Sequence, residues 1–319
     1  MKILVTGAAG FIGSHLSEAL KKQGHSVMGV DNFAPYYSEE LKRVNEEDLK
    51  EVGVEVENLD LAEDDLSDLV TGIEVVYHLA AQPGISAKTP FEDYLKNNII
   101  ATNRLLNSLE NVSVKLFVNI ATSSCYGSDA SYPEDHELKP TSYYGVTKLA
   151  AEQLVLARQR EKGLPACSTR LFSVYGERER PEKLHPKVIY SILDSKYKFP
   201  LFEGSKGHLR SFTYVGDIVD GLVSVLENRD KCIGEIFNLG LDVTSTTGEI
   251  ISIIEELMGK KAKFDIVPKR AGDQEKTSAN IQKARRILGY NPTTKPEEGL
   301  KKEIDWFKEK VWQKINLYQ

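Results

Sequence analysis

The sequence predicts an α/β fold, in which a doubly wound parallel β-sheet is followed by a smaller C-terminal α/β lobe. Two observations lead to this prediction. In the first half of the 319 residues, short apolar runs alternate with amphipathic stretches, which is typical of parallel strands connected by helices. After about residue 172 the alternation loosens into charge-rich loops that contain Pro181, Pro186 and Pro200. This chain length suits one domain with a second lobe.

Strands are expected where aliphatic residues cluster, in segments 3–5, 27–30, 54–56, 75–77, 116–118 and 167–171. Helices are expected where the apolar residues follow a helical period, in segments 12–20, 93–109 and 144–159 and in the tail from Pro296. Two more apolar segments, 218–226 and 236–239, are expected to return the chain to the main sheet. We therefore expect the first domain to span 1–172, with 210–240 returning to it, and the second lobe to span 173–319.

Composition excludes several classes of function. A net charge of −6 lacks the basic footprint of a nucleic-acid-binding surface, so no nucleic acid is expected as a partner. No stretch approaches 18 uninterrupted apolar residues, so no membrane span is expected. The cysteines at 125, 167 and 232 are widely spaced and match neither a disulfide framework nor a metal-binding motif. We expect a soluble, cytoplasmic protein that binds no metal.

A glycine-rich turn between the first strand and the first helix predicts a dinucleotide site. Gly7, Gly10 and Gly13 permit a tight turn and let a pyrophosphate approach the backbone at the helix N-terminus. Asp31 ends the second strand at about the expected 20 residues further on. A carboxylate there accepts hydrogen bonds from ribose hydroxyls and repels a 2′-phosphate, which favours NAD over NADP. The alternative is a glycine turn that only lets the helix pack on the sheet.

Further cofactor contacts are expected where strands end. Asp60 and Leu61 follow the third strand and are well placed to meet the adenine. The remaining expected cofactor residues are Phe11, Ile12, Asn32, Leu79, Ala80, Ala81, Tyr144 and Lys148.

Tyr144 and Lys148 are four residues apart on a predicted helix. They therefore share one helix face, with about 5–6 Å between their Cβ atoms. Tyrosine ordinarily titrates near pH ~10, and a nearby ammonium group lowers that pKa. Such a tyrosine can take a proton from an alcohol near neutral pH and return it. Beside a nicotinamide, the pair predicts a hydride-transfer site.

Besides the glycine turn and the Tyr144–Lys148 pair, the chain carries a series of motifs in a fixed order: His78–Ala81, Thr122–Gly127, Arg170–Gly176, Arg210–Val215, Phe237–Gly240, Arg270–Asp273 and Ala284–Gly289. Together they resemble the extended short-chain dehydrogenase/reductases, and within them the nucleotide-sugar epimerases. The resemblance covers essentially the whole chain. It implies a Rossmann domain that binds NAD, a substrate-binding lobe, and a homodimer formed through the helices that follow Asp93 and Tyr144.

The resemblance implies that Tyr144 is the catalytic base, that Lys148 holds the ribose and lowers the tyrosine pKa, and that Thr122 hydrogen-bonds the reacting sugar oxygen. Ser123 and Ser124 stand where sugar-nucleotide 4,6-dehydratases carry an Asp-Glu pair to eliminate water. This favours an epimerase that inverts C4 of a UDP-hexose through a transient 4-keto intermediate. The alternatives are a nucleotide-sugar reductase or dehydratase and a non-catalytic dinucleotide sensor. The hydroxyl cluster could also simply cap a strand end.

The resemblance also implies a substrate site. Arg210 and Arg270 would grip the nucleotide diphosphate, and Asp273 would touch its ribose. The run 177–181 resembles epimerases acting on UDP-glucuronate, in which an arginine at the position of Arg180 meets the C6 region of the sugar. The alternative is that Arg178 and Arg180 belong to a solvated charge run. The sugar stays open between glucuronate, glucose and N-acetylglucosamine. The expected substrate residues are Thr122, Ser123, Ser124, Tyr144, Ser173, Arg180, Arg210, Arg270 and Asp273.

Overall fold

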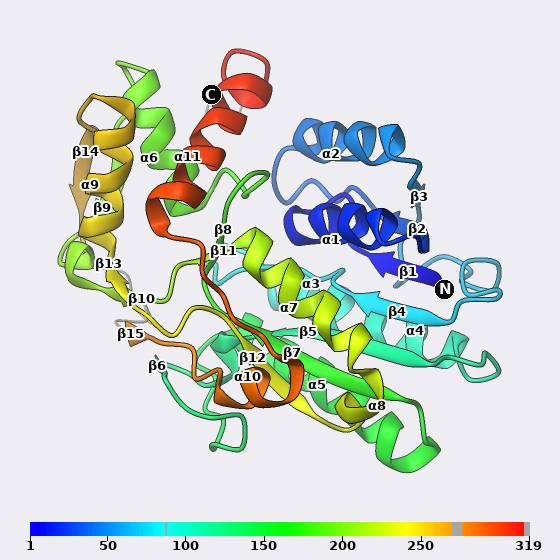
Figure 1. The fold of residues 1–319 in the computed structure, drawn as a ribbon. Coiled ribbons are helices and arrows are strands. Elements are labelled where there is room, and N and C mark those ends of the chain that lie inside the picture. Colours follow the sequence, from blue (N-terminus) through cyan, green and yellow to red (C-terminus); the bar gives the residue numbers. More distant parts are fainter. Residues whose placement is uncertain (87, 270–275, 316–319) are drawn as a thin grey trace.

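The centre of the molecule is a seven-stranded parallel sheet (Figure 1). The computed structural model describes residues 1–86, 88–269 and 276–315. From edge to edge the strands are β12 (Ile236–Leu239), β7 (Ala166–Leu171), β5 (Leu116–Thr122), β4 (Val75–His78), β1 (Lys2–Thr6), β2 (Ser26–Asp31) and β3 (Glu55–Asn58). The chain extends from β1 first toward β3 and then, after crossing back, from β4 toward β12. The predicted doubly wound sheet is therefore confirmed.

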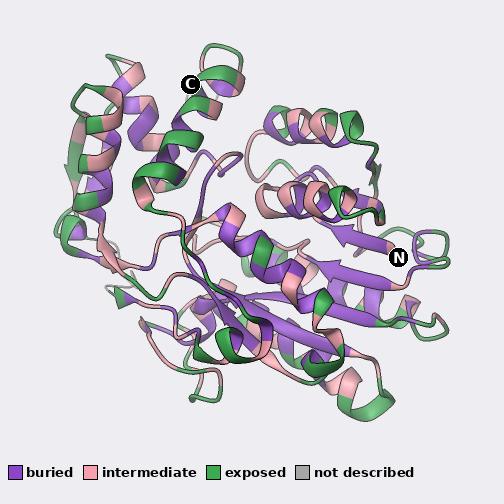
Figure 2. Ribbon diagram, viewed as in Figure 1, coloured by how far each residue is buried: buried purple, intermediate pink, exposed green. Residues whose placement is uncertain are grey.

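Helices cover both faces of the sheet, and a hydrophobic cluster fills each layer. One cluster packs the sheet against α1 (Phe11–Lys22), α7 (Val215–Glu227) and α10 (Gln282–Leu288). The other packs it against α4 (Ala101–Ser108) and α5 (Tyr143–Lys162). Strands β4 and β5 are buried along their whole length, as the purple central strands of Figure 2 show. Burial on both faces explains why these strands are nearly continuous apolar runs rather than alternating ones.

Three elements differ from the sequence-based expectation. Segment 218–226 lies in α7, a helix that packs against α1 and the sheet, whereas only 236–239 joins the sheet, as edge strand β12. The helix expected at 93–109 consists of α3 (Phe91–Tyr94), a π-helical segment η1 (Leu95–Ile100) and α4. Helix α2 (Glu39–Glu51) is unexpected because its sequence is mostly charged, although Leu41 and Leu49 are buried.

A third hydrophobic cluster gathers elements from the second half of the chain. It joins α6 (Leu184–Leu193), β9 (Phe199–Phe202), α9 (Thr247–Met258), α11 (Pro296–Trp306) and the segment η4 (Phe307–Val311), together with Leu41 of α2. The remaining helix is the short α8 (Arg229–Cys232). No helix within the described ranges has the length and apolar character needed to cross a membrane.

Three small sheets accompany this cluster. Strand β9 pairs with β14 (Phe264–Val267), and β8 (Val174–Tyr175) pairs with β11 (Thr213–Tyr214). The third sheet has four short strands, β13 (Ser245–Thr246), β10 (Leu209–Arg210), β15 (Lys276–Thr277) and β6 (Asp129–Ala130). Because β6 comes from the first half of the chain, this sheet connects the two parts of the sequence.

Candidate active site

A cavity of about 700 Å³ lies where the main sheet meets the third cluster. Its wall is formed on one side by residues at the carboxyl ends of the strands, such as Asp31, the last residue of β2, and Thr122, the last residue of β5. Residues of β9 and β10 form part of the other side. In open α/β sheets, ligands bind at the carboxyl ends of the strands where the strand order reverses. The cavity therefore has the expected place for a dinucleotide and its substrate.

All predicted site residues within the described ranges line this cavity. Fourteen of them come from the predicted cofactor set: Tyr144 and Lys148, and also Gly7, Gly10, Phe11, Ile12, Gly13, Asp31, Asn32, Asp60, Leu61, Leu79, Ala80 and Ala81. The others are Thr122, Ser123, Ser124, Ser173, Arg180 and Arg210. Two predicted substrate residues, Arg270 and Asp273, lie outside the described residues.

The glycine turn needs its glycines for close packing. Gly7 has a φ of +70°, and a Cβ atom there would lie 2.9 Å from the backbone nitrogen of Ala80. A Cβ at Gly13 would lie 2.1 Å from the carbonyl oxygen of Gly7. Gly10 is the N-cap residue of α1 and places no side chain over the first helical turn. A helix N-terminus so open to the cavity can accept a pyrophosphate.

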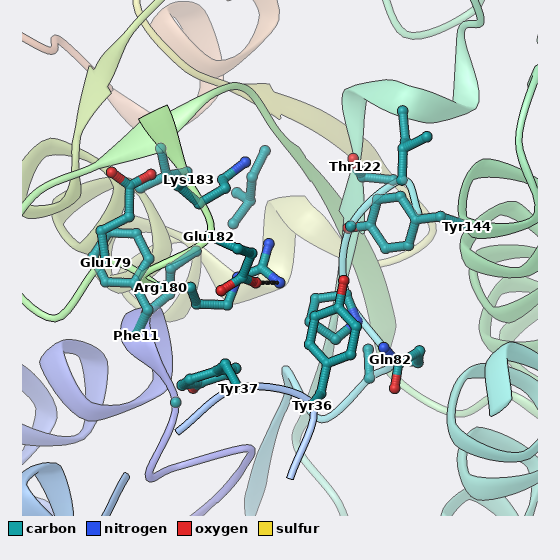
Figure 3. Close-up of a pocket in the computed structure, with 18 of the residues that line it drawn as sticks. Phe11, Tyr36, Tyr37, Gln82, Thr122, Tyr144, Glu179, Arg180, Glu182 and Lys183 are labelled. Atoms are coloured by element: carbon teal, nitrogen blue, oxygen red, sulfur yellow. Dashed lines mark ion pairs between the residues drawn. The ribbon is translucent and has the colours of Figure 1, made fainter. Parts of the chain in front are cut away.

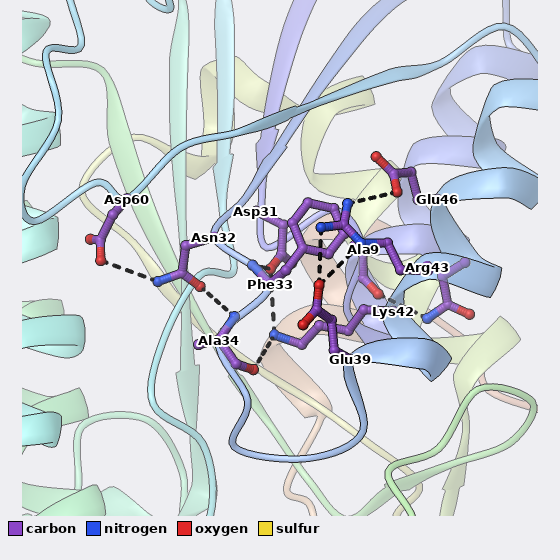
Figure 4. Close-up of polar contacts among 11 residues, drawn as sticks. Ala9, Asp31, Asn32, Phe33, Ala34, Glu39, Lys42, Arg43, Glu46 and Asp60 are labelled. Atoms are coloured by element: carbon purple, nitrogen blue, oxygen red, sulfur yellow. Dashed lines mark hydrogen bonds and ion pairs between the residues drawn. The ribbon is translucent and has the colours of Figure 1, made fainter. Parts of the chain in front are cut away.

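Asp31 is held in place by two neighbours (Figure 4). Its Oδ1 accepts a hydrogen bond of 2.9 Å from the backbone nitrogen of Phe33 and lies 3.5 Å from Nζ of Lys42. Lys42 also donates to the carbonyl oxygen of Ala34, at 3.0 Å. Lys42 is buried, lines the cavity and is missing from the predicted set. It partly neutralises the carboxylate that is expected to repel a 2′-phosphate.

Tyr144 and Thr122 meet at the junction of α5 with the end of β5 (Figure 3). Helix α5 begins with Ser142 as its N-cap, whose hydroxyl accepts a hydrogen bond from the backbone nitrogen of Gly145. A Cβ at Gly145 would lie 2.7 Å from the carbonyl oxygen of Ser124. This close approach presses the first turn of α5 against the 122–124 segment. As a result, the hydroxyl of Thr122 lies close enough to the phenol of Tyr144 to lower its pKa.

The electrostatics of Tyr144 differ from the expectation. Burial raises the pKa of the Tyr144 phenol, and the main opposing influences are the Thr122 hydroxyl and the positive charge of Arg180. The net shift of the Tyr144 pKa is therefore upward, opposite to the lowering expected from Lys148. Lys148 is itself buried, and burial lowers its pKa to about 8. Desolvation of the Tyr144 phenol therefore outweighs the lowering of its pKa that the four-residue spacing to Lys148 predicts.

Two reactive side chains near the site have structural roles. Cys125 is fully buried, and burial raises the pKa of its thiol to about 12. His78 lies between hydroxyls, with Nδ1 2.8 Å from Oγ1 of Thr6 and Nε2 2.9 Å from Oγ1 of Thr102. Burial lowers the pKa of His78 to about 3, so the ring is neutral. A protonated thiol and a neutral core histidine carry no nucleophilic chemistry here.

The charged run 177–182 is not a solvated surface. Arg178 is buried and pairs with Glu18 of α1 at 2.6 Å and Asp48 of α2 at 3.0 Å, away from the cavity. Arg180 lies in the cavity wall, with Nη1 2.8 Å from Oε1 of Glu182. The alternative of a solvated charge run is therefore wrong for both arginines, and only Arg180 can reach a ligand.

Sequence reasoning missed several cavity residues. Tyr36 and Tyr37 follow Asp31 in the loop after β2, and the guanidinium of Arg180 lies 5.7 Å from the ring centre of Tyr36. Gln82 follows directly on the 78–81 motif. Their positions just beyond recognised strand ends are the only sequence signal that points to them. Glu182 carries no such signal, because its place depends on how the 177–183 segment folds.

The carboxyl ends of this parallel sheet carry a glycine turn, an acidic residue at the end of β2 and a Thr-Tyr-Lys set. This combination defines the class of extended short-chain dehydrogenase/reductases. The sequence model of the NAD dependent epimerase/dehydratase family matches residues 3–240, and the chain belongs to this family. NAD as the predicted cofactor is confirmed at the level of the family. The glycine turn, the open N-terminus of α1 and Asp31 fit this cofactor.

Several individual relatives within the family are named as UDP-sugar epimerases. An uncharacterized UDP-glucose epimerase of Bacillus subtilis is 39% identical over 311 residues, which cover 95% of this chain and 97% of the relative. UDP-glucuronate 4-epimerase 3 of Arabidopsis thaliana is 36% identical over 96% of this chain and 76% of its own length. The crystal structure of UDP-glucuronic acid 4-epimerase from Bacillus cereus, in complex with UDP-glucuronic acid and NAD, superposes with a TM-score of 0.92. It is 38% identical and covers 97% of this chain and 99% of its own.

Proposed function

We propose that the protein is an NAD-dependent UDP-sugar 4-epimerase. The observation that carries the proposal is the pair Ser123 and Ser124 directly beside Thr122 and Tyr144. The site offers a proton acceptor at Tyr144 but no carboxylate at the positions where a dehydratase has its extra acid and base. The Bacillus and Arabidopsis epimerases of similar sequence support the same reaction class.

NAD, when bound, supplies a reversible hydride acceptor for C4 of the sugar. The residues of the chain transfer the proton of the C4 hydroxyl. Tyr144 Oη accepts this proton and later returns it, and the hydroxyl of Thr122 lowers the pKa of the phenol. Lys148 is assigned to the cofactor ribose. Inversion requires that C4 lose its hydride from one face and regain it on the opposite face, after the 4-keto sugar has turned in the site. Because the proton and the hydride are both returned, this residue set would leave the cofactor unchanged overall.

For the substrate we favour a UDP-uronate. Arg180 would bind a C6 carboxylate, and the hydroxyls of Ser123 and Ser124 would contact the same sugar; all three residues line the cavity, which supports these roles. Arg210 and Ser173 are assigned to the diphosphate and sugar, and Arg270 and Asp273 keep the roles that the family resemblance implies. A guanidinium matches the two oxygens of a carboxylate or phosphate.

The test is a panel of UDP-glucuronate, UDP-glucose and UDP-N-acetylglucosamine, each incubated with the NAD-loaded protein and analysed for its C4 epimer. Arg180→Ala should raise KM for UDP-glucuronate about 10–100-fold, because a hydrogen bond to a charged group is worth roughly 1.5–3 kcal/mol. The change for UDP-glucose should be far smaller. A requirement for added NADPH, with a reduced sugar as the sole product, would refute the epimerase and establish the reductase.

We further infer a two-lobed organisation and a homodimer. The third hydrophobic cluster supports a substrate-binding lobe built mainly from 173–319. Phe91, Ile100, Tyr143 and Val146 are exposed apolar residues on α3, η1 and α5, the helices expected at the dimer interface. Tyr143→Glu should shift the mass in solution from dimer to monomer, as measured by light scattering.

The described cysteines are all free and buried, which supports a cytoplasmic location.

A further inference from the structure

Arg180, the proposed carboxylate ligand, already has a carboxylate partner within the cavity. Nη1 of Arg180 lies 2.8 Å from Oε1 of Glu182, and both residues line the same cavity (Figure 3). The Arg180 side chain is 13% exposed and that of Glu182 is 35% exposed. The pair is therefore partly desolvated, so each charge strongly influences the other.

The backbone around Arg180 is held rigidly by its neighbours. Glu179 lies 3.1 Å from Nδ1 of His185, which is also 3.4 Å from Glu303 on α11. On the other side, Arg178 pairs with residues of α1 and α2. These contacts with α1, α2, α6 and α11 fix the position of the segment. Ligand binding can therefore change the partner of the Arg180 side chain without moving its backbone.

The guanidinium of Arg180 lies against the loop after β4, with both terminal nitrogens close to Gly84. Nη2 of Arg180 lies 3.3 Å from the position that a Cβ of Gly84 would take, in the loop after β4. The positive charge of Arg180 also reaches Tyr144, since it lowers the pKa of that phenol. Arg180 thus lies near both the proposed catalytic base and Glu182, so the C6 group of a sugar whose C4 hydroxyl meets Tyr144 would come close to it.

We propose that Glu182 determines sugar specificity by competing with the substrate for Arg180. Together, Arg180 and Glu182 make the C6 subsite neutral, so it accepts an uncharged CH₂OH group without leaving a buried cation unpaired. A uronate carboxylate, in contrast, must approach Arg180 against the like charge of Glu182. The site is therefore tuned to accept both kinds of sugar. This inference rests on the proposed function, because it presumes a UDP-sugar in the cavity.

The experiment measures binding of UDP-glucuronate and UDP-glucose by calorimetry on NAD-loaded protein. All proteins carry Tyr144→Phe, which prevents conversion during the titration. Glu182→Gln should raise the affinity for UDP-glucuronate relative to UDP-glucose by about 10-fold, the lower end of the range for a hydrogen bond to a charged group. Glu182→Ala removes the charge without adding an amide donor and should shift the ratio in the same direction.

Two controls separate competition from a general change of charge. Glu203→Gln removes an exposed carboxylate that lies outside the cavity wall and should leave the affinity ratio unchanged. In an Arg180→Ala background, Glu182→Gln should no longer change the ratio. An equal shift without Arg180 would show that Glu182 acts through a long-range field and would overturn the proposal.

Two further outcomes would also overturn it. Weaker binding of UDP-glucuronate in both Glu182 variants would mean that Glu182 orients Arg180 rather than competing for it. An unchanged ratio would mean that Glu182 has no part in specificity. Failure of the proposed function appears separately, as the absence of any C4 epimer with the wild-type protein.

Discussion

The side chain of Thr122, at the end of β5, lies beside the phenol of Tyr144 on α5. The contact exists because Gly145 allows the first turn of α5 to approach the 122–124 segment closely. It lowers the pKa of a phenol that burial otherwise raises. The balance between these two influences decides at which pH Tyr144 can act as a base.

Tyr144→Phe keeps the ring and its packing but removes the proton acceptor. Turnover should fall by at least about 10²–10⁴-fold, the usual contribution of general acid–base catalysis. NAD binding and thermal stability should stay close to those of the wild type. Steady-state rates, cofactor content and a melting curve test this together. Near-normal turnover would show that another group is the base.

Thr122→Val removes the hydroxyl and retains a side chain of similar shape. The loss of activity should be smaller than in Tyr144→Phe, because the base remains. Without this contact the pKa of Tyr144 rises further, so the acidic limb of the pH–rate profile should move to higher pH. Activity should then recover in part under alkaline conditions. An unmoved acidic limb would mean that Thr122 positions the sugar but does not tune Tyr144.

Asp31→Ala should weaken NAD binding about 10–100-fold, because it removes a charged acceptor for ribose hydroxyls. It should also strengthen NADP binding, since Lys42 would lose its partner at 3.5 Å and could pair with a 2′-phosphate. Titration of both cofactors measures the change in preference. The double variant Asp31→Ala/Lys42→Ala is the control and should lose the gain toward NADP. Unchanged selectivity in the single variant would place the discrimination elsewhere.

The buried pairing of His185 with Glu179 and Glu303 predicts a dependence of stability on pH. The two carboxylates raise the pKa of His185 to about 10, against the opposing effect of burial. A raised pKa in the folded state stabilises the protein fully below the unfolded value of about 6.5. This stabilisation is lost as the pH rises toward 10.

The melting temperature of the wild type should therefore fall between about pH 6.5 and 10, and the fall should be shallower in His185→Gln. His136→Gln is the matched control, because His136 is exposed and should leave the slope unchanged. Melting curves at intervals of pH measure both. Equal slopes in all three proteins would show that His185 is not protonated in the folded state.

The sequence by itself determined the doubly wound sheet, the cofactor turn and the Thr-Tyr-Lys set. These features are encoded over short distances. The glycine spacing sets the backbone of one turn, and Tyr144 and Lys148 share a helix face because they are four residues apart. Strand ends could be located from apolar runs, so Asp31 and Asp60 could be placed at one edge of the sheet.

Only the tertiary structure decided how the charges pair. The sequence left open whether Arg178 and Arg180 belong to a solvated charge run, yet Arg178 is bound to α1 and α2 and Arg180 faces the cavity. Lys42, which pairs with Asp31, lies on α2, a helix that was not predicted because its sequence is mostly charged. Such contacts join separate elements, and desolvation, which local spacing cannot reveal, sets their strength. For the same reason burial reversed the expected direction of the shift in the Tyr144 pKa.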